Sequence, residues 1–451
     1  MNIVIPKDVS KIIDILESHG HEAYIVGGCV RDSLLGREPN DWDITTSAKP
    51  LQVKALFYKT IDTGLKHGTV TVLIDKTGYE ITTYRIDGNY EDHRRPDQVT
   101  FTTSLKEDLR RRDFTINAMA YNDRRGLVDL FGGAKDLETG TIRCVGDPNE
   151  RFDEDALRML RAIRFAGQLG FDIEESTFKA ITLKRDLLRN VSAERIRMEL
   201  LKMMISPHPD VIRKAYEAKL TEVFFPEFDR MMETPQNNPH HKYTVGEHTL
   251  LGIKNIEPNP ILRMTLLLHD IAKPVTRTTD VKGIDHFHNH PKIGSEMAKD
   301  ILRRLKFDNR SIYLITTLIL YHDTRFHDPA GKGRAHVRRM INKVGDKLFP
   351  YLLKVMEADV RAQGTYMQEQ KLSLLGETAV VYEEIIKAGN CLTLKDLKIN
   401  GRQLMALGFK EGAALGETLD TLLAMVLEHP ELNEYIYLKE LALKLGNCAG
   451  E

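Results

Sequence analysis

The chain has 451 residues, of which 42% are hydrophobic and 29% are charged, and its formal net charge is −1. This length allows several domains with sizeable cores, and the composition is that of an ordinary globular protein. A net charge near zero excludes a uniformly basic surface, so a nucleic-acid partner would have to be bound by local basic patches.

The cysteines and the apolar residues exclude further classes. The four cysteines are scattered and include no C-x-x-C pair, which argues against a structural zinc site or a disulfide framework and favours the reducing cytoplasm. The N-terminus lacks a signal-peptide pattern, and no apolar run approaches about eighteen residues. We therefore expect a cytoplasmic location and no membrane partner.

The first predicted element is an amphipathic helix over 8–19. Its apolar residues recur at i, i+3, i+4 and i+7, at Val9, Ile12, Ile13 and Leu16. This spacing places them on one helix face, which we expect to pack on a sheet.

The next stretch predicts a strand, a glycine turn and a short helix. The apolar run Tyr24–Val26 stops at Gly27 and Gly28, and Val30–Leu35 then has helical spacing up to Gly36. Glycine adopts positive φ and lets another group approach the backbone closely, which suits a turn that binds phosphate. The start of the helix would favour an anion as well.

Two aspartates follow this turn. Asp41-Trp42-Asp43-Ile44 is predicted as a second strand, in which residues i and i+2 point to one face. Adjacent carboxylates repel each other unless a cation lies between them, and Mg²⁺ prefers such hard oxygen ligands together with substrate phosphates. A phosphate turn beside paired carboxylates indicates nucleotidyl transfer. The alternative is a surface loop with two solvated aspartates.

The sequence GGCVRDSLLG followed by DWDI resembles the signature of class II tRNA nucleotidyltransferases (CCA-adding enzymes) and related bacterial poly(A) polymerases. The resemblance implies a polymerase β-type head in which Asp41 and Asp43 bind Mg²⁺. It also implies that Gly27, Gly28 and Arg31 bind phosphates. The substrates would be tRNA, CTP and ATP.

A third carboxylate lies on a predicted hairpin. Lys66–Ile74 and Tyr79–Tyr84 alternate as strands, and Asp75–Gly78 forms the turn between them. Glu80 starts the second strand, and polymerase β-like sites use a third carboxylate beside the aspartate pair. An edge-strand glutamate that faces water is the alternative.

A solvated loop is predicted over Ile86–Val99 and a helix over Leu105–Tyr121. The helix contains RRDFTINAMA, which resembles the second motif of the family. The resemblance implies that Arg112 reaches the ribose or the triphosphate and that Asp113 orients it. A charged, solvated helix face is the alternative for the run Arg110–Arg112.

Residues 150–171 are predicted as one helix that carries Glu154, Asp155, Arg158, Arg161 and Arg164. A carboxylate acceptor beside a guanidinium donor would match the amino and ring-nitrogen edges of cytosine and adenine and would refuse uracil and guanine. A mismatch leaves buried polar groups unpaired, at about 1–3 kcal/mol each. The stretch also resembles the E-D-x-x-R base-reading motif of the family. That resemblance assigns base reading to Asp155 and Arg158, and support of phosphates or of the helix to Arg161 and Arg164. An intrahelical ion pair is the alternative.

Histidines cluster between residues 240 and 327, and His269-Asp270 lies in the apolar segment ILRMTLLLHDIAKP. Polar groups on an apolar helix are costly unless they are satisfied, and a metal would satisfy them. The pattern resembles the HD phosphohydrolases, which implies a divalent transition-metal site at His248, His269, Asp270, His290, His322 and Asp359. Some relatives hydrolyse terminal or 2′,3′-cyclic phosphates at this site and others keep a remnant, so activity stays open.

We therefore expect an α+β nucleotidyltransferase head with a mixed sheet, followed by an all-α neck, HD body and tail. The predicted parts are a head at 1–145, a neck that binds RNA and the base at 146–235, an HD domain at 236–375, and a tRNA-binding tail at 376–451.

The leading interpretation is a CCA-adding tRNA nucleotidyltransferase with two Mg²⁺ ions in its head. A poly(A) polymerase, an A-adding enzyme or a CC-adding enzyme would share the same motifs. A further alternative is an HD phosphohydrolase whose head only binds RNA. The oligomeric state cannot be predicted from these patterns.

Overall fold

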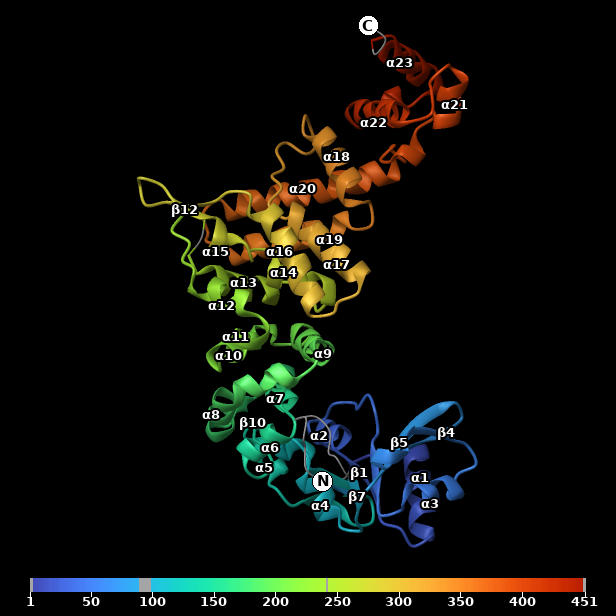
Figure 1. Cartoon of the computed structure of the whole chain (residues 1–451), viewed down its shortest axis with the longest axis vertical. Helices are drawn as coiled ribbons and strands as arrows, with labels where there is room; N and C mark the ends of the chain where they lie inside the picture. The colour runs from blue at the N-terminus through green and yellow to red at the C-terminus, as the bar shows by residue number, and fades with distance from the viewer. Residues whose placement is uncertain (1–2, 89–98, 241, 449–451) are drawn as a thin grey trace. The chain divides into compact units, whose positions relative to one another are not determined.

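A computed structural model describes residues 3–88, 99–240 and 242–448. The chain divides into two compact units, Met1–Pro226 and Glu227–Glu451. Figure 1 follows the elements along the chain. In the described part of the chain, every helix falls short of the length or apolarity that a membrane crossing requires.

The first unit is built on a seven-stranded mixed sheet with the strand order β3-β4-β5-β2-β1-β8-β9. β2 and β5 pair in parallel, and their neighbours pair antiparallel. The strands are β1 (Ala23–Val26), β2 (Ile44–Thr46), β3 (Thr60–Gly64), β4 (Thr69–Ile74), β5 (Thr77–Thr83), β8 (Met119–Asn122) and β9 (Gly126–Asp129). The predicted hairpin is β4–β5, with Asp75 and Lys76 at positive φ in its turn.

Short helices surround this sheet. They are α1 (Lys7–Ser18), α2 (Gly28–Leu34), α3 (Pro50–Leu56), α4 (Leu105–Arg110) and α5 (Gly133–Glu138). α1 buries the four predicted residues Val9, Ile12, Ile13 and Leu16. α1 contacts β1 and β2, α3 contacts β4 and β5, and the two helices contact each other (Figure 1). The apolar stripe of α1 therefore covers the sheet as its spacing indicates.

The helix predicted over Leu105–Tyr121 is wrong beyond its first turns. α4 ends at Arg110, a 3₁₀ turn covers Thr115–Asn117, and β8 then enters the sheet between β1 and β9. Every residue of β8 is buried. A central strand covered on both faces has no alternating pattern, so a short apolar run is easily mistaken for part of a helix.

The loop predicted over Ile86–Val99 is wrong at its ends. β6 (Arg85–Asp87) and β7 (Val99–Phe101) pair antiparallel. Residues 89–98 of this prediction lie outside the described residues.

The rest of the first unit is helical. It contains α6 (Pro148–Glu154), α7 (Leu157–Leu169), α8 (Glu175–Lys184), α9 (Ala193–Met204), α10 (Ile212–Glu217), α11 (Thr221–Phe224) and the first residue of α12 (Pro226–Glu233). Two short parallel strands, β10 (Thr141–Ile142) and β11 (Asp172–Ile173), lie among them.

The single helix predicted over 150–171 is wrong, because it breaks at Asp155. This residue has extended backbone angles, φ −138° and ψ 102°. Its Oδ1 accepts a hydrogen bond from the backbone N–H of Leu157, 3.1 Å away. An aspartate that bonds to a nearby backbone group competes with the helix, and the chain restarts as α7.

The second unit is almost entirely helical. It contains α13 (Val245–Lys254), α14 (Pro260–Leu268), α15 (Lys273–Thr276), α16 (His290–Arg304), α17 (Asn309–Tyr321), α18 (Arg334–Val344), α19 (Phe349–Ala362), α20 (Gln368–Lys387), α21 (Gly401–Ala406), α22 (Ala413–Glu428) and α23 (Tyr435–Cys448). A small hairpin, β12 (Arg277–Thr279) and β13 (Asp285–Phe287), interrupts the helices. The predicted fold class, a mixed-sheet head followed by a mostly helical remainder, is confirmed.

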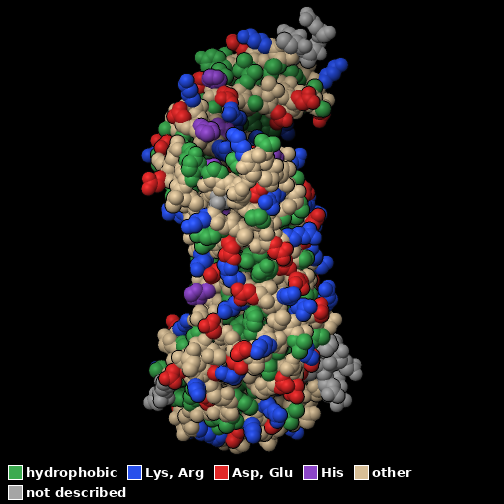
Figure 2. Space-filling model, turned by 90° about the vertical axis from the view of Figure 1, so that its left-hand side faces the viewer, with side chains coloured by type: hydrophobic (Ala, Val, Ile, Leu, Met, Phe, Trp, Pro, Cys, Tyr) green, Lys and Arg blue, Asp and Glu red, His purple; other side chains and the backbone are tan. Residues whose placement is uncertain are grey.

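Charges of both signs are interspersed on the face of the molecule shown in Figure 2. This distribution agrees with the net charge of −1. Binding of an anion on this face therefore depends on individual basic side chains rather than on a broad positive field.

Candidate functional site

The glycine turn brings two guanidinium groups to the end of β1. Gly27 has φ +81°, and a Cβ at this position would lie 3.0 Å from Nη1 of Arg112. Arg31, on α2, donates from Nη1 to Oδ1 of Asn117 at 2.7 Å. Its Nε also donates to Asp32, at 2.9 Å. The positive φ strains any residue with a side chain at Gly27, and a Cβ there would also crowd Arg112.

Asp41 and Asp43 lie just before β2 and not within it, since that strand begins at Ile44. The predicted strand is therefore wrong over Asp41–Asp43. The backbone C=O of Asp43 still accepts from the N–H of Val26 at 3.0 Å. One register step further on, the opposing chain turns into α2, so Asp41 has no strand partner to extend the ladder.

Glu80 joins the two aspartates through the sheet register. Ile44 pairs with Ile81 in parallel, which places Glu80 beside Asp43. All three carboxylates are exposed. Partial desolvation raises the pKa of Glu80, and the charges of Asp43 and Asp41 raise it further. Desolvation also raises the pKa of Asp43, where Arg112 opposes and Asp41 reinforces it. The three carboxylates therefore repel one another, and a hard divalent cation fits this donor set.

Arg112 is positioned by a buried carboxylate on α4. Asp108 accepts from Oγ1 of Thr45 at 3.1 Å and from Nη2 of Arg111 at 2.7 Å, and Nη2 of Arg112 lies 3.6 Å away. Burial opposes ionisation of Asp108, but Arg111 and Arg112 outweigh it and lower the pKa. Within the described residues, the buried Nε of Arg112 has no hydrogen-bond partner.

Asp113 connects α7 to the glycine turn. It accepts from Nε of Arg161 at 2.8 Å and from Nδ2 of Asn117 at 3.1 Å, while Asn117 also accepts from Arg31. Burial opposes ionisation of Asp113, but Arg161 and Asn117 outweigh it and hold the pKa far below its usual range. The resemblance implied that Arg112 reaches the ribose or the triphosphate and that Asp113 orients it. In the structure it orients Arg161 and Asn117.

Asp155 and Arg158 flank the break between α6 and α7. Oδ2 of Asp155 lies 2.8 Å from Nη2 of Arg195 on α9. Nη1 of Arg158 donates to Glu154 at 2.5 Å, and Nη2 donates to the C=O of Arg111 at 3.0 Å. Asp155 therefore pairs with Arg195, and Arg158 pairs with Glu154. The alternative interpretation was an intrahelical ion pair between Asp155 and Arg158.

Arg164 belongs to the packing of α7 on α9. Its Nε donates to Glu199 at 2.5 Å, and its guanidinium lies 3.8 Å from the centre of the Phe165 ring. Arg31 and Arg161 also face this ring, at 5.2 and 5.4 Å. Of the two roles that the resemblance allows for Arg164, the geometry favours support of the helix.

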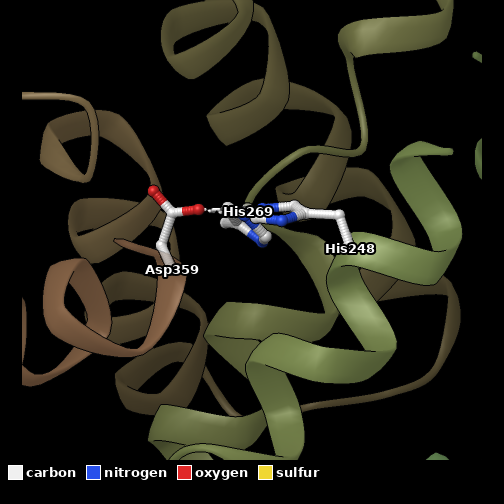
Figure 3. A group of neighbouring side chains, drawn as sticks. All are labelled: His248, His269 and Asp359. Carbon is white, nitrogen blue, oxygen red and sulfur yellow. Dashed lines mark hydrogen bonds and ion pairs between the residues drawn. The ribbon is translucent and has the colours of Figure 1, made fainter. Parts of the chain in front are cut away.

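All six residues of the predicted second site converge. His248 lies on α13, His269 and Asp270 follow α14, His290 begins α16, His322 follows α17, and Asp359 lies on α19. Figure 3 shows His248 and Asp359 pointing toward His269 from opposite sides. Nε2 of His248 lies 2.8 Å from Asp359 and 3.3 Å from Nε2 of His269.

The other side of this cluster is centred on Asp270. Its carboxylate lies 3.2 Å from Nε2 of His269, 3.5 Å from that of His290 and 3.7 Å from that of His322. Both of its oxygens are buried without a hydrogen-bond partner among the described residues, although Lys273 forms an ion pair with Oδ2 at 2.7 Å.

Every histidine of the cluster is held by a backbone carbonyl. Nδ1 of His248, His269, His290 and His322 lies 3.3, 2.7, 2.8 and 2.6 Å from the C=O of Ala362, Leu266, Phe287 and Ile319. A carbonyl only accepts, so each Nδ1 carries a proton and each Nε2 faces the centre of the cluster. Metal-binding histidines are oriented in this way.

The electrostatics of the cluster favour a positive charge at its centre. Burial opposes ionisation of Asp270, but His269 and Lys273 outweigh it and hold the pKa well below its usual range. Burial also lowers the pKa of His269, yet Asp270 and Asp359 outweigh it and raise it to about 10. The Nε2 atoms of His248 and His269 lie 3.3 Å apart beside these carboxylates, and a divalent metal fits this donor set.

Several supporting residues were not predicted from the sequence. Asp108, Asn117 and Arg195 each pair with a predicted site residue. The position of Asn117 inside RRDFTINAMA was a usable signal, and so was Asp108 four residues before Arg112. Arg195 carries no comparable signal, because its contact depends on how α9 packs.

Three stretches of the chain match known families. The Poly A polymerase head domain matches residues 23–143. The Probable RNA and SrmB-binding site of polymerase A matches 170–232, and the tRNA nucleotidyltransferase domain 2 matches 284–442.

One relative matches nearly the whole chain, and another matches about three fifths of it. A CCA-adding enzyme of Lactobacillus helveticus is 38% identical over 422 residues, which is 92% of this chain and 91% of the relative. A CCA-adding enzyme of Pediococcus pentosaceus is 45% identical over 290 residues, 62% of this chain and 73% of the relative.

Solved structures of CCA-adding enzymes have a fold similar to that of this chain. The Bacillus stearothermophilus CCA-adding enzyme in complex with CTP has a TM-score of 0.72 and 28% identity, with 99% of each chain covered. The Thermotoga maritima CCA-adding enzyme complexed with tRNA has a TM-score of 0.60 and 23% identity, with 98% of this chain and 97% of that chain covered. At that lower identity the likeness supports the fold.

The head fold and these matches define a metal-dependent nucleotidyltransferase. The chain belongs to the CCA-adding enzymes, which add C, C and A to the 3′ end of tRNA. The relatives support CCA addition over the poly(A), A-adding and CC-adding alternatives and over a phosphohydrolase with an RNA-binding head.

We predict that Asp113→Asn destabilises the protein in a pH-dependent way. Its pKa is lower in the folded state, so ionised Asp113 stabilises the fold above the unfolded pKa near 3.9, and this contribution is lost as the pH falls further. The loss at pH 7 should be about 2 kcal/mol and should shrink below about pH 4. Urea unfolding at several pH values measures this difference.

Asp172→Asn is the matched control. Asp172 is exposed and forms a surface ion pair with Lys214, a contact expected to contribute less than about 1 kcal/mol. An Asp113→Asn difference that stayed constant from pH 7 to pH 3 would contradict the proposed network.

Proposed function

We propose that the head transfers CMP and AMP units from CTP and ATP to the 3′-hydroxyl of tRNA, with Asp41, Asp43 and Glu80 as the catalytic carboxylates. The observation that supports this assignment is the sheet register: Ile44 pairs with Ile81, so Glu80 lies beside Asp43, whose C=O accepts from Val26 just before the glycine turn. The solved relatives in complex with CTP and with tRNA support these substrates.

The surrounding residues have separate roles in this proposal. Gly27 and Gly28 let the triphosphate approach the backbone, and the guanidinium groups of Arg31 and Arg112 bind its oxygens. Mg²⁺ held by the carboxylates would lower the pKa of the tRNA hydroxyl and neutralise the leaving pyrophosphate.

Base selection is assigned to Asp155 and Arg158. Each has polar atoms that match cytosine and adenine. Asp155 lies on the extended backbone of the break before α7, and Arg158 lies in the first turn of α7. To read a base, Asp155 would exchange part of its contact with Arg195, and Arg158 part of its contact with Glu154. Arg161 would hold α7 in place through Asp113.

We also infer the division of labour along the chain. The head (1–145) would carry the chemistry, the neck (146–235) the base selection, and the tail (376–451) the tRNA contact. The observed boundary between the compact units, after Pro226, falls close to the proposed boundary at 235/236. A cytoplasmic location stays a prediction.

We expect Asp43→Asn to abolish nucleotide addition while RNA binding persists. Loss of one metal-binding carboxylate should lower the rate by about a thousandfold or more. Extension of tRNA transcripts that end at the discriminator base, at C and at CC, with CTP and ATP, measures the activity, and a filter-binding assay measures the affinity.

Asp62→Asn is the control for this experiment, because Asp62 lies on β3 of the same sheet and pairs only with Lys54 among the described residues. Retained turnover in Asp43→Asn would remove the carboxylate assignment. Long A tails from the unaltered protein would contradict CCA addition.

Arg158→Ala should relax base selection. With one member of the acceptor and donor pair removed, misincorporation of UMP and GMP relative to CMP should rise by about tenfold or more. Single-nucleotide extension with each of the four nucleotides measures this ratio, and the exposed Arg189→Ala serves as control. Unchanged selectivity together with weaker RNA binding would assign Arg158 to the RNA instead.

A second activity is favoured by the histidine cluster. We infer that His248, His269, Asp270, His290, His322 and Asp359 bind a divalent transition metal and form a phosphohydrolase centre of the HD type. The inward-facing Nε2 atoms and the buried carboxylate of Asp270, which lies near three of them, support this inference. The metal would activate a water molecule for attack on phosphorus.

His269→Ala should remove the metal and leave nucleotide addition intact. Elemental analysis of the purified proteins measures the metal content, phosphatase assays with Mn²⁺, Ni²⁺ or Co²⁺ measure the hydrolysis, and the exposed His429→Ala is the control. Equal metal content in His269→Ala and the unaltered protein would contradict the centre. Loss of nucleotide addition would instead show that the two activities are coupled.

A further inference from the structure

One phenylalanine ring lies among three arginines of the first unit. Phe165 is on α7 and is only 4% exposed. The guanidinium carbon of Arg164 lies 3.8 Å from the centre of this ring, and those of Arg31 and Arg161 lie at 5.2 and 5.4 Å. A cation within about 6 Å of an aromatic centre is attracted by the ring quadrupole. Phe165 therefore attracts arginines from both α2 and α7.

Arg31 depends on this ring more than the other two arginines do. Arg161 and Arg164 each donate to a carboxylate outside α7. The carboxylate partner of Arg31 is instead Asp32, its neighbour on the same helix, α2. That pair cannot fix the Arg31 guanidinium relative to the rest of the head, so its position depends on contacts with other elements.

Two such contacts are present. Nη1 of Arg31 donates to Oδ1 of Asn117 at 2.7 Å, and the guanidinium faces the ring of Phe165. The amide holds one end of the guanidinium. The ring attracts its whole positive charge, because the quadrupole acts on the cation rather than on a single N–H group.

The ring also leaves hydrogen-bond donors of Arg31 available. A guanidinium has five N–H groups. Nε and Nη2 each donate to Asp32, at 2.9 and 3.0 Å, and Nη1 donates to Asn117. One N–H on Nη1 and one on Nη2 therefore lack a partner among the groups that the structure describes. A Cβ at Gly28 would lie 3.7 Å from Nη2, so Nη2 lies beside the glycine turn.

An aromatic side chain suits this position for a physical reason. A second carboxylate would take the remaining donors of Arg31 and would repel a triphosphate. A leucine would fill the space without attracting the cation. A ring attracts the guanidinium and keeps its N–H groups for a ligand.

We propose that Phe165 is a positioning residue for nucleotide binding, whose ring holds the Arg31 guanidinium beside the glycine turn so that the remaining N–H groups bind the triphosphate. The proposal rests on the assignment of Arg31 to the triphosphate made above. It gives α7 a second role, since base selection is assigned to the start of this helix and Phe165 lies two turns further on. Phe165 should therefore affect all four nucleotides equally.

The test places phenylalanine analogues with one, two, three and five ring fluorines at position 165 of the full-length protein. Fluorine weakens the ring quadrupole but leaves the ring nearly the same size, so a purely structural role would not respond in proportion. The dissociation constant of inorganic tripolyphosphate in the presence of Mg²⁺, measured by titration calorimetry, should rise with each fluorine. The pentafluoro ring should raise it by about three- to fivefold. Selectivity for CTP over UTP should stay constant.

Phe224 is the matched control. It is 5% exposed on α11 of the same unit, and within the described residues its ring faces no arginine. The same analogues at position 224 should leave the affinity for tripolyphosphate unchanged.

Arg31→Gln tests whether the ring acts through Arg31. This variant should bind tripolyphosphate about tenfold more weakly, and the fluorine series should have no effect in its background. An undiminished fluorine effect would overturn the proposal, because the ring would then act through Arg161 or Arg164. Unchanged affinity in Arg31→Gln would overturn both the proposal and the assignment of Arg31.

The binding measurement separates this proposal from the proposed function. Affinity that falls with fluorine content supports the role of Phe165, even if the protein fails to extend tRNA. Affinity that is independent of fluorine content overturns that role, even if the protein adds C, C and A.

Discussion

One backbone hydrogen bond positions the chemistry of the head. The N–H of Val26 donates to the C=O of Asp43, and this contact fixes the start of β2 beside the end of β1. The glycine turn and the aspartates are consequently brought to the same place by main-chain geometry alone. Parallel pairing with β5 then adds Glu80. A shift of one residue in this register would turn the carboxylates to the other face of the sheet.

The histidine cluster depends on a comparable principle, although it is built on helices. Backbone carbonyls near helix ends fix the ring orientation of each histidine, so the ligand set is preorganised by groups that carry no chemistry of their own. Such a site needs little rearrangement to bind a cation. It also explains why four histidines can be buried together at low cost: each ring satisfies one nitrogen locally and offers the other.

Parts of the fold and of both sites could be predicted because their signals are local. The spacing of Val9, Ile12, Ile13 and Leu16 sufficed for α1, and the glycine turn and the aspartates sufficed to propose a head site, which stays a prediction. The predictions of secondary structure were wrong where tertiary contacts decide the local structure. β8 is helical by its local pattern but is a central strand, and the break at Asp155 depends on a side chain that bonds to the backbone. The contacts of Asn117 with Arg31 and of Arg195 with Asp155 could not be predicted, since these partners are distant in the sequence.

Asn117 also links two charged side chains of the head, Arg31 and Asp113. Its amide oxygen accepts from Arg31 and its amide nitrogen donates to Asp113, so the side chain connects a cation to an anion without carrying charge. The two ends of the amide are not interchangeable, because its oxygen accepts from the cation and its nitrogen donates to the anion. An aspartate of the same shape would face Asp113 with a like charge, and a leucine would leave Arg31 and Asp113 without this partner. The amide of Asn117 thus links the turn that begins with Gly27, through Arg31, to the helix that carries Arg161, through Asp113.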